Sequence, residues 1–518
     1  MTLREKIFKT FLVTIREINE HGGPEEFFKK YPVGGMFYGE GNALRNEIGQ
    51  EVGTQMTYEK LLECKKHAPY KLWVCADGCQ IRGQKLLNNG KPLAASPDPE
   101  VDAYEYGRVI GMQMNDKGID CVLGPAIDMC FDHTTAWGMS NDPILTARIY
   151  RQVIRGIRDQ GVCATAKHFP GMGTHHINMH LAPGQNVFDM DRWMKTYGYT
   201  YKEMFREGVD SVMNTHITLK SYDPDVHDGF LPIATFSEKL TTKLLKEELG
   251  FRGPVITDAL IMGGMATGDL VAETVQAFKA GADLLLWPPV EAAEAIENAI
   301  VKGDIPMSRL EDALSRIDAM EQFRHKALEE TRFDTPDPVY ADAVLERIVA
   351  RGISLDRNER KLLPFGKTVN SVLIINSTGD ENSEACELMV RELNGRGIQA
   401  EIRRHIYDKE SLVCWQKDVD ALQQDFDRVL FMVQADHGLW STALMTIWAS
   451  HLFDKSKKII ANFGSPWFAQ DYFPEDPTLI QVNCGADEIS VKALAERLCG
   501  EAAFTGVSFN PCLEELNV

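Results

Sequence analysis

The feature that most constrains this fold is a series of short apolar runs, several of which end in polar residues. In the first part of the chain the runs are residues 33–38, 70–76, 121–127, 162–166, 211–213, 254–256 and 282–286, with amphipathic helical stretches between them. The polar ends are Asp77, Asp128, Lys167 with His168, Asn214 with His216, and Thr257 with Asp258. A (β/α) barrel gathers such residues at one end of its strands, so the pattern predicts a TIM-type barrel over residues 1–335.

A second alternating pattern follows a linker. Residues 331–338 contain two prolines and two aspartates that interrupt the periodicity, and a helix is expected over 340–351. Strands are then expected at residues 372–376, 400–404, 429–433, 458–463 and 479–482, with helices such as 384–393 and 489–498 between them. We therefore predict a linker and helix at 336–365, followed by a doubly wound α/β sandwich domain at 366–518.

Charge and cysteine content exclude several classes of function. The formal net charge of -20 disfavours a nucleic-acid or anionic-membrane partner. No stretch reaches the ~20 apolar residues of a membrane span, and residues 1–23, charged and amphipathic at helical spacing, lack the features of a signal peptide. The 11 cysteines are scattered without CxxC pairs, which is typical of reduced thiols. We expect a cytoplasmic protein with a small ligand and no membrane partner, while its oligomeric state is unknown.

Residues 167–183, KHFPGMGTHHINMHLAP, form the most chemically varied segment of the chain. His176 and His180 have the i, i+4 spacing of some metal ligands, but the glutamate of HExxH is missing and the segment has no cysteine or carboxylate. Solvated loop histidines are the favoured interpretation, and no metal is predicted. Lys167 could form a Schiff base if burial lowered its pKa, but the following HFPG turn points to a binding lysine instead.

Asp258 follows the run 254–256 and precedes a turn rich in glycine and methionine. A carboxylate at this position could be a nucleophile or a base, or it could cap a helix. Asp77 and Asp128 carry the same ambiguity, and each one alone is typical of a cap or turn. The expected position of all three at one end of the barrel favours a functional role for the set.

Several motifs occur in a characteristic order. These are GPAID at 124–128, GVCATAKHFPGMG at 161–173, His180 followed by Pro183, and LPIATFSEKLTTKLLKEELGFRGPVITDAL at 231–260. Further along are GADLLLWP, RGISLDRNERKLLP and FGSPWFAQDYFP. On these motifs the chain resembles glycoside hydrolase family 3, in particular its β-N-acetylglucosaminidase (β-N-acetylhexosaminidase) branch. The resemblance extends over nearly the whole chain and implies a barrel followed by an α/β sandwich.

The resemblance also implies roles for individual residues. In a retaining glycosidase of this family, Asp258 would attack the anomeric carbon and His180 would be the acid/base. Asn178 stands where the family has an aspartate that supports this histidine, and His176 is an alternative support. The residues expected to bind a small carbohydrate substrate are Asp77, Asp128, Lys167 and His168. No cofactor is implied.

Four positions depart from the family pattern. They are Asn178, Met172 in place of the histidine of FPGHG, GCQI at 78–81 in place of DxEGG, and Trp137 in place of an arginine. An uncharged Asn178 cannot stabilise a protonated His180 as an aspartate would. Three interpretations therefore stay open: a glycosidase with a shifted substrate, a glycoside phosphorylase, and a sugar-binding protein on a degenerate enzyme scaffold.

Overall fold

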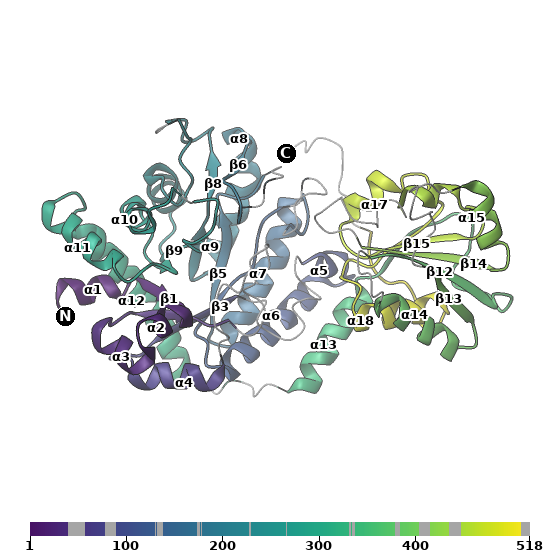
Figure 1. The fold of residues 1–518 in the computed structure, drawn as a ribbon, viewed down its shortest axis with the longest axis horizontal. Helices are drawn as coiled ribbons and strands as arrows, with labels where there is room; N and C mark the ends of the chain where they lie inside the picture. The colour runs from purple at the N-terminus through teal and green to yellow at the C-terminus, as the bar shows by residue number, and fades with distance from the viewer. Residues whose placement is uncertain are drawn as a thin grey trace.

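The computed structural model describes residues 1–39, 57–77, 90–129, 131, 138–173, 177, 179–226, 229–265, 267–330, 333, 337–378, 384–403, 415–434 and 447–508. Within these ranges, eight parallel strands form a barrel in the order β10-β1-β2-β3-β4-β5-β7-β9 (Figure 1). A bridge between Ile256 and Leu284 joins the two outer strands of this sheet, so the barrel is nearly closed. Its strands are β1 (Phe11–Val13), β2 (Gly35–Phe37), β3 (Trp73–Asp77), β4 (Cys121–Leu123), β5 (Cys163–Phe169), β7 (Ser211–Asn214), β9 (Val255–Thr257) and β10 (Leu285–Leu286). The predicted barrel is confirmed.

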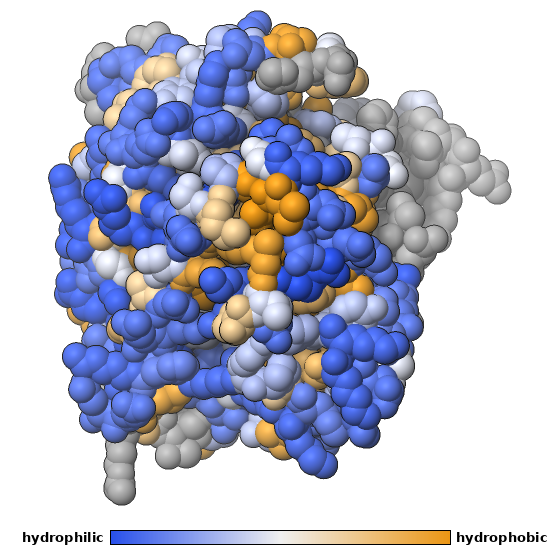
Figure 2. Space-filling view, turned by 90° about the vertical axis from the view of Figure 1, so that its left-hand side faces the viewer, coloured by the Kyte–Doolittle hydropathy of each residue, from blue (hydrophilic) through white to orange (hydrophobic). Residues whose placement is uncertain are grey.

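Helices pack around the barrel because each has one apolar face. In α7 (Pro143–Asp159), for example, the buried residues recur every three or four positions, and the side chain of Asp142 caps the first turn. The other barrel helices are α1 (Leu3–Phe8), α2 (Ile15–Glu20), α3 (Gly23–Lys30), α4 (Tyr58–His67), α5 (Lys91–Ala95), α6 (Pro99–Asp116), α8 (Met190–Trp193), η4 (Met194–Gly198), α9 (Tyr199–Glu207), η5 (Lys239–Glu248), α10 (Leu270–Ala280), α11 (Ala292–Lys302) and α12 (Met307–Glu330). The face of the molecule shown in Figure 2 is mainly hydrophilic, with hydrophobic residues gathered near its middle.

Two barrel strands differ from the sequence expectation. Residues 1–23, expected to be helical, contain β1 between α1 and α2, because Phe11, Leu12 and Val13 are fully buried and continue the sheet. The strand expected to end at residue 166 continues to Phe169. Lys167 therefore lies within β5, where its backbone N–H donates to Pro125 and its carbonyl accepts from Ile127. Polar side chains at a barrel end do not stop a strand whose backbone groups still find partners.

The inside of the barrel is filled by one apolar cluster, and α12 covers its amino-terminal end. Ile317 and Met320 of α12 pack into this cluster with residues of the strands, among them Leu12, Phe37, Cys75, Leu123 and Ile256. At the opposite, carboxyl-terminal end, long loops follow the strands. The barrel is thus closed at one end, and polar chemistry is confined to the other.

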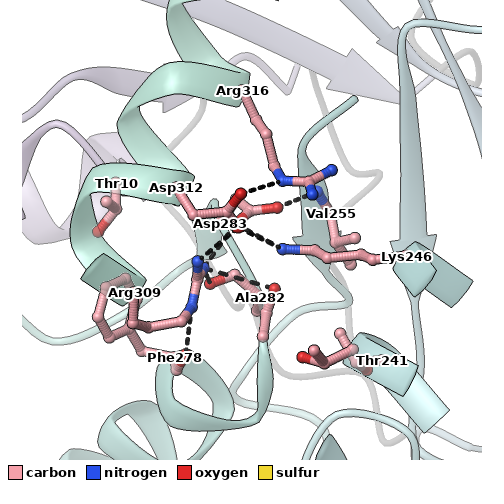
Figure 3. Close-up of polar contacts among 12 residues, drawn as sticks. Thr10, Thr241, Lys246, Val255, Phe278, Ala282, Asp283, Arg309, Asp312 and Arg316 are labelled. Atoms are coloured by element: carbon pink, nitrogen blue, oxygen red, sulfur yellow. Dashed lines mark hydrogen bonds and ion pairs between the residues drawn. The ribbon is translucent and has the colours of Figure 1, made fainter. Parts of the chain in front are cut away.

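The amino-terminal end carries a repeated arrangement of aspartates. Three of them each accept a hydrogen bond from a backbone N–H of the neighbouring strand: Asp120 from Val74, Asp210 from Ala164, and Asp283 from Val255. Each also pairs with a cation: Asp120 with Arg324, Asp210 with Arg158, and Asp283 with Lys246 and Arg309. Figure 3 shows the Asp283 cluster, in which Asp312 and Arg316 of α12 extend the network. This end of the barrel is therefore held by buried ion pairs.

A second domain follows the long helix α13 (Pro338–Arg351), which packs on α6 and on α18 (Figure 1). In its described part, six strands are ordered β11-β16-β15-β14-β12-β13. They are β11 (Ser354–Asn358), β12 (Ser371–Ser377), β13 (Gln399–Arg403), β14 (Arg428–Val433), β15 (Lys458–Asn462) and β16 (Thr478–Gln481). The helices are α14 (Glu384–Gly395), α15 (Gln416–Gln423), η6 (Ser450–Leu452), α17 (Pro466–Tyr472) and α18 (Glu488–Leu498). The predicted α/β sandwich is confirmed.

One strand of this sheet was not expected. β11 is antiparallel to β16 and lies in the segment 336–365 that the sequence analysis assigned to a linker and helix. Its sequence SLDRN has only one apolar residue, Leu355, and an edge strand of this kind gives no clear apolar run. Among the described helices, none is long and apolar enough to cross a membrane.

Candidate functional site

Asp258 lies at the carboxyl-terminal end of β9 with both carboxylate oxygens engaged. Oδ2 accepts a hydrogen bond from the Thr215 hydroxyl at 2.6 Å, and Oδ1 accepts one from the backbone N–H of Ala259 at 2.9 Å. Asp258 is only partly buried, so it remains accessible at the open end of the barrel. The carboxylate is thus held in a fixed orientation without being sealed off.

The electrostatic surroundings favour the ionised form of Asp258. Burial raises its pKa, but His168, the Thr215 hydrogen bond and Lys167 act against burial, and the pKa lies below its ordinary value. A carboxylate in this state is a competent nucleophile at neutral pH.

His216 supports the turn that carries Asp258. It is fully buried, with Nε2 at 3.2 Å from the Ala259 carbonyl and Nδ1 at 2.9 Å from the Thr235 hydroxyl. Because a carbonyl can only accept, Nε2 must carry the proton, and in the neutral ring Nδ1 accepts from Thr235. Burial also lowers the pKa of His216, which favours this neutral form.

Asp128 organises the start of the loop after β5. It is fully buried, and its Oδ2 lies 2.7 Å from Nδ1 of His168. The same carboxylate accepts from the backbone N–H of His168 and from that of Met172. Asp128 therefore fixes the His168 ring and the loop backbone together, which makes it a positioning residue as well as a candidate for substrate binding.

Lys167 and Asp77 form an ion pair on the same side of the barrel. Lys167 Nζ lies 2.8 Å from Asp77 Oδ1, and the two side chains are 16% and 34% exposed. The pair presents one donor group and one acceptor group toward the open end. Such a pair can bind the hydroxyl groups of a sugar, whose oxygens both donate and accept.

His180 lies on an exposed part of the loop after β5, and this loop is docked against the turn after Asp258. The backbone N–H of Gly263 donates to the His180 carbonyl at 2.9 Å, and that of Gly264 donates to the Met179 carbonyl at 3.0 Å. A Cβ at Gly263 would lie 2.7 Å from the His180 carbonyl, so this contact requires glycine. The pKa of His216 is lowered mainly by burial, and His180 lowers it further.

The loop is anchored at its other end by aromatic side chains. The Tyr197 hydroxyl accepts from the Gly173 N–H, and Trp193 Nε1 donates to the Pro170 carbonyl. Gly171 has a φ of 97° and packs so closely on the Tyr197 ring that no Cβ would fit. A short parallel pair, β6 (Gly184–Asn186) with β8 (Ile217–Leu219), holds the end of the loop.

The structure brings most of the predicted site residues to one end of the barrel, namely Asp258, Asp77, Asp128, Lys167, His168 and His180. Asn178 and His176 lie outside the described residues, as do Trp137 and residues 78–81. Met172 is buried in the barrel cluster. Among the described residues, no three His, Cys, Asp or Glu side chains are arranged to hold a metal ion.

Sequence reasoning missed Thr215 and gave no role to His216. The polar end of the run 211–213 was a signal for both residues. It did not show that Thr215 would reach Asp258, since the two are 43 residues apart along the chain.

Comparison with known proteins decides the family. Residues 2–320 match the glycosyl hydrolase family 3 N terminal domain, which is more than half of the chain. The chain belongs to glycosyl hydrolase family 3. This confirms the family noted from the motifs.

Curated relatives of this family 3 chain have two kinds of activity in their names. A β-N-acetylglucosaminidase/β-glucosidase of Cellulomonas fimi is 30% identical over 249 residues, which cover 46% of this chain and 44% of the relative. A β-hexosaminidase of Methylobacillus flagellatus is 27% identical over 245 residues, which cover 46% of this chain and 66% of the relative. The chain thus matches less than two thirds of the length of each.

Solved structures share the fold of the family 3 chain over nearly its whole length. A β-glucoside phosphorylase aligns with a TM-score of 0.79 at 21% identity and covers 98% of this chain and 94% of its own. A family 3 β-N-acetylglucosaminidase from Paenibacillus sp. aligns with a TM-score of 0.77 at 23% identity and covers 98% of both chains. The likeness establishes the two-domain architecture.

Proposed function

We propose that the protein is a retaining glycoside hydrolase that acts on a β-linked N-acetylhexosaminide or a related β-glycoside. The observation that carries this proposal is the state of Asp258: ionised, oriented by Thr215 and Ala259, and accessible at the open end of a family 3 barrel. A retaining glycosidase needs one such carboxylate as nucleophile.

In the proposed reaction, Asp258 attacks the anomeric carbon and the bond to the leaving oxygen breaks. His180 gives its proton to that oxygen, so that a glycosyl-aspartate and an alcohol form. His180 then takes a proton from water, which attacks the anomeric carbon and releases Asp258. The docking of the His180 loop on the Asp258 turn supports this division of roles. We assign Asn178 and His176 as supports of His180 from the sequence alone.

The remaining polar residues would bind the sugar. The ion pair of Lys167 with Asp77 and the pair of His168 with Asp128 offer fixed donors and acceptors for ring hydroxyls. The names of the curated relatives support an N-acetylhexosaminide or a glucoside. The described cysteines are free thiols, and all but Cys499 are buried, which supports a reducing cytoplasmic location.

A glycoside phosphorylase is the second candidate. Phosphate would replace water as the acceptor, and an uncharged Asn178, two residues before His180 in the sequence, repels an anion less than an aspartate would. The sugar-binding alternative keeps the same pocket residues but lacks turnover.

The test is release of nitrophenol from β-N-acetylglucosaminide, β-glucoside and β-xyloside, with and without phosphate. Wild type, Asp258→Asn and Asn178→Asp are compared with the control Asp269→Asn, in which the new side chain can still cap α10. We expect Asp258→Asn to lower kcat/KM by about 10⁴-fold and the control to match wild type.

Each outcome favours one candidate. Turnover that requires phosphate would favour the phosphorylase. Saturable sugar binding without turnover, unchanged in Asp258→Asn, would favour the binding protein. Full activity in Asp258→Asn, or a covalent adduct trapped on another residue, would contradict the proposed nucleophile.

A further inference from the structure

The open end of the barrel has two chemically different sides. The polar residues of the candidate site come from five neighbouring strands, β3, β4, β5, β7 and β9, or from the loops that follow them. All the strands line the interior with apolar side chains, and β10, β1 and β2, whose interior residues include Leu286, Leu12 and Phe37, contribute no described residue to the polar site. A sugar ring has the same division, with hydroxyl groups around its edge and C–H groups on its faces.

Trp287 directly follows β10 on the apolar side and is close to the nucleophile turn. The residue before it, Leu286, donates its N–H to the Thr257 hydroxyl at 2.9 Å and accepts from the Leu260 N–H at 3.0 Å. Asp258 lies between these two partners in the chain. Trp287 is partly exposed and packs against the interior cluster, with its ring 5.3 Å from that of Phe37 in an edge-to-face arrangement.

The backbone turns the Trp287 side chain inward. Leu284, just before β10, and Leu286 within it face the barrel interior, while Leu285 faces the helices. Regular alternation would send the next side chain, Trp287, outward. Trp287 instead has a φ of 63°, a left-handed conformation that is rare for a bulky residue, and its ring packs inside. Strained conformations of this kind concentrate at ligand sites.

The polar tip of the indole is not what faces solvent. Nε1 of Trp287 is buried and, within the part of the chain that the structure describes, has no hydrogen-bond partner. The accessible surface of this residue therefore excludes its N–H group. A partly exposed aromatic ring beside a polar half-site is the kind of surface on which sugar C–H groups can pack.

We infer that Trp287 is a substrate-contacting residue, and that its indole forms the apolar wall on which the C–H face of a pyranose ring stacks while the polar side binds its hydroxyls. This inference rests on the proposed function, because it places the sugar beside Asp258. Stacking that is equal in the ground state and the transition state lowers KM with little effect on kcat.

The experiment compares wild type with Trp287→Phe, Trp287→Leu and Trp287→Ala. Leucine keeps an apolar side chain but has no aromatic face. The matched control is Trp73→Phe: Trp73 lies in the same cluster and also has a buried Nε1 without a described partner, but it begins β3 at the closed end. Calorimetric titration with N-acetylglucosamine and with glucose measures binding, and nitrophenyl glycosides give kcat and KM.

We expect Trp287→Ala and Trp287→Leu to weaken sugar binding by about tenfold or more and to raise KM, with kcat changed less. Trp287→Phe should retain most of the binding, and Trp73→Phe should bind like wild type. Equal binding in Trp287→Leu and Trp73→Phe would overturn the inference, as would full binding in Trp287→Ala.

The two proposals fail in different ways. If wild type turns over none of the glycosides but binds a sugar that Trp287→Leu loses, the proposed function fails and the inference stands. If wild type neither binds nor turns over any of these sugars, both are overturned. Melting temperatures show whether a variant is misfolded. If Trp287→Ala is misfolded, the comparison of Trp287→Phe with Trp287→Leu tests the inference.

Discussion

Aspartates stand at both ends of this barrel, and their partners differ. At the closed, amino-terminal end the partners are backbone N–H groups and buried Arg or Lys side chains, as for Asp120, Asp210 and Asp283. At the open end Asp77, Asp128 and Asp258 pair instead with Lys167, His168 and the Thr215 hydroxyl, and Asp128 and Asp258 also accept from backbone N–H groups. One residue type thus serves stability where helices cover its cationic partners, and is available for chemistry where its side-chain partners surround an open site.

The largest expected effect is at the closed end. Asp283→Asn leaves the Lys246 ammonium buried, with only 4% of its side chain exposed, and removes a partner of Arg309. Breaking a buried ion pair costs about 3–5 kcal/mol. Because Asp312 still lies 3.4 Å from Lys246 and 3.1 Å from Arg309, we expect the free energy of unfolding to fall by about 3 kcal/mol in urea denaturation. The control Asp191→Asn changes an exposed carboxylate, and we expect an effect below about 0.5 kcal/mol. If Asp283→Asn lost turnover but kept its stability, the assignment of the closed end to stability would be contradicted.

The second effect is at the open end. Gly263→Ala places a methyl group against the His180 carbonyl and must displace the loop that carries His180. A shift of about 1 Å in a catalytic group can cost roughly 10²-fold, so kcat/KM should fall by that factor while the melting temperature changes little. Gly395→Ala, with no atom within 4 Å of the added Cβ, is the matched control. If Gly263→Ala were as active as Gly395→Ala, the position of the His180 loop would not matter for catalysis.

The third effect is a pH dependence of stability that arises from Asp210 at the closed end. Burial raises the pKa of Asp210 to about 6, above the ~3.9 of an unfolded aspartate. The folded state therefore holds this proton more tightly, and the free energy of unfolding falls as pH rises from about 4 to about 6. Asp210→Asn removes this slope, so relative to wild type it should gain about 2 kcal/mol between pH 4.5 and pH 7. A constant difference across this range would show that Asp210 is already ionised at pH 4.5.

The smallest effect concerns the orientation of Asp258. Thr215→Val removes a hydroxyl that lowers the pKa of Asp258, so the acidic limb of the kcat/KM profile should move to higher pH. A hydrogen bond to a charged group is worth about 1.5 kcal/mol, which corresponds to roughly tenfold in rate at acidic pH. Thr215→Ser keeps the hydroxyl and should keep the wild-type profile. An unmoved acidic limb in Thr215→Val would mean that Asp258 does not depend on this bond.

Much of the architecture could be predicted from the sequence. Apolar runs that end in polar residues predicted the barrel, a second alternation of strands and helices predicted the sandwich domain, and the ordered motifs predicted the family. The elements that were missed are short or of low apolar content: β1 has three residues, and β11 has one apolar side chain. Local patterns of this size do not distinguish a strand from a helix or a linker.

The sequence by itself determined which segments form most of the strands and which polar residues lie near their ends, because alternation and apolar runs are local properties of the chain. Only the tertiary structure decided which of those residues meet: Thr215 with Asp258, Lys167 with Asp77, and the His180 loop with Gly263. These contacts depend on barrel closure and on strand register, which involve residues far apart in the chain. The inward turn of Trp287 was equally hidden, because a positive φ at a bulky residue is imposed by its surroundings and contradicts local preference.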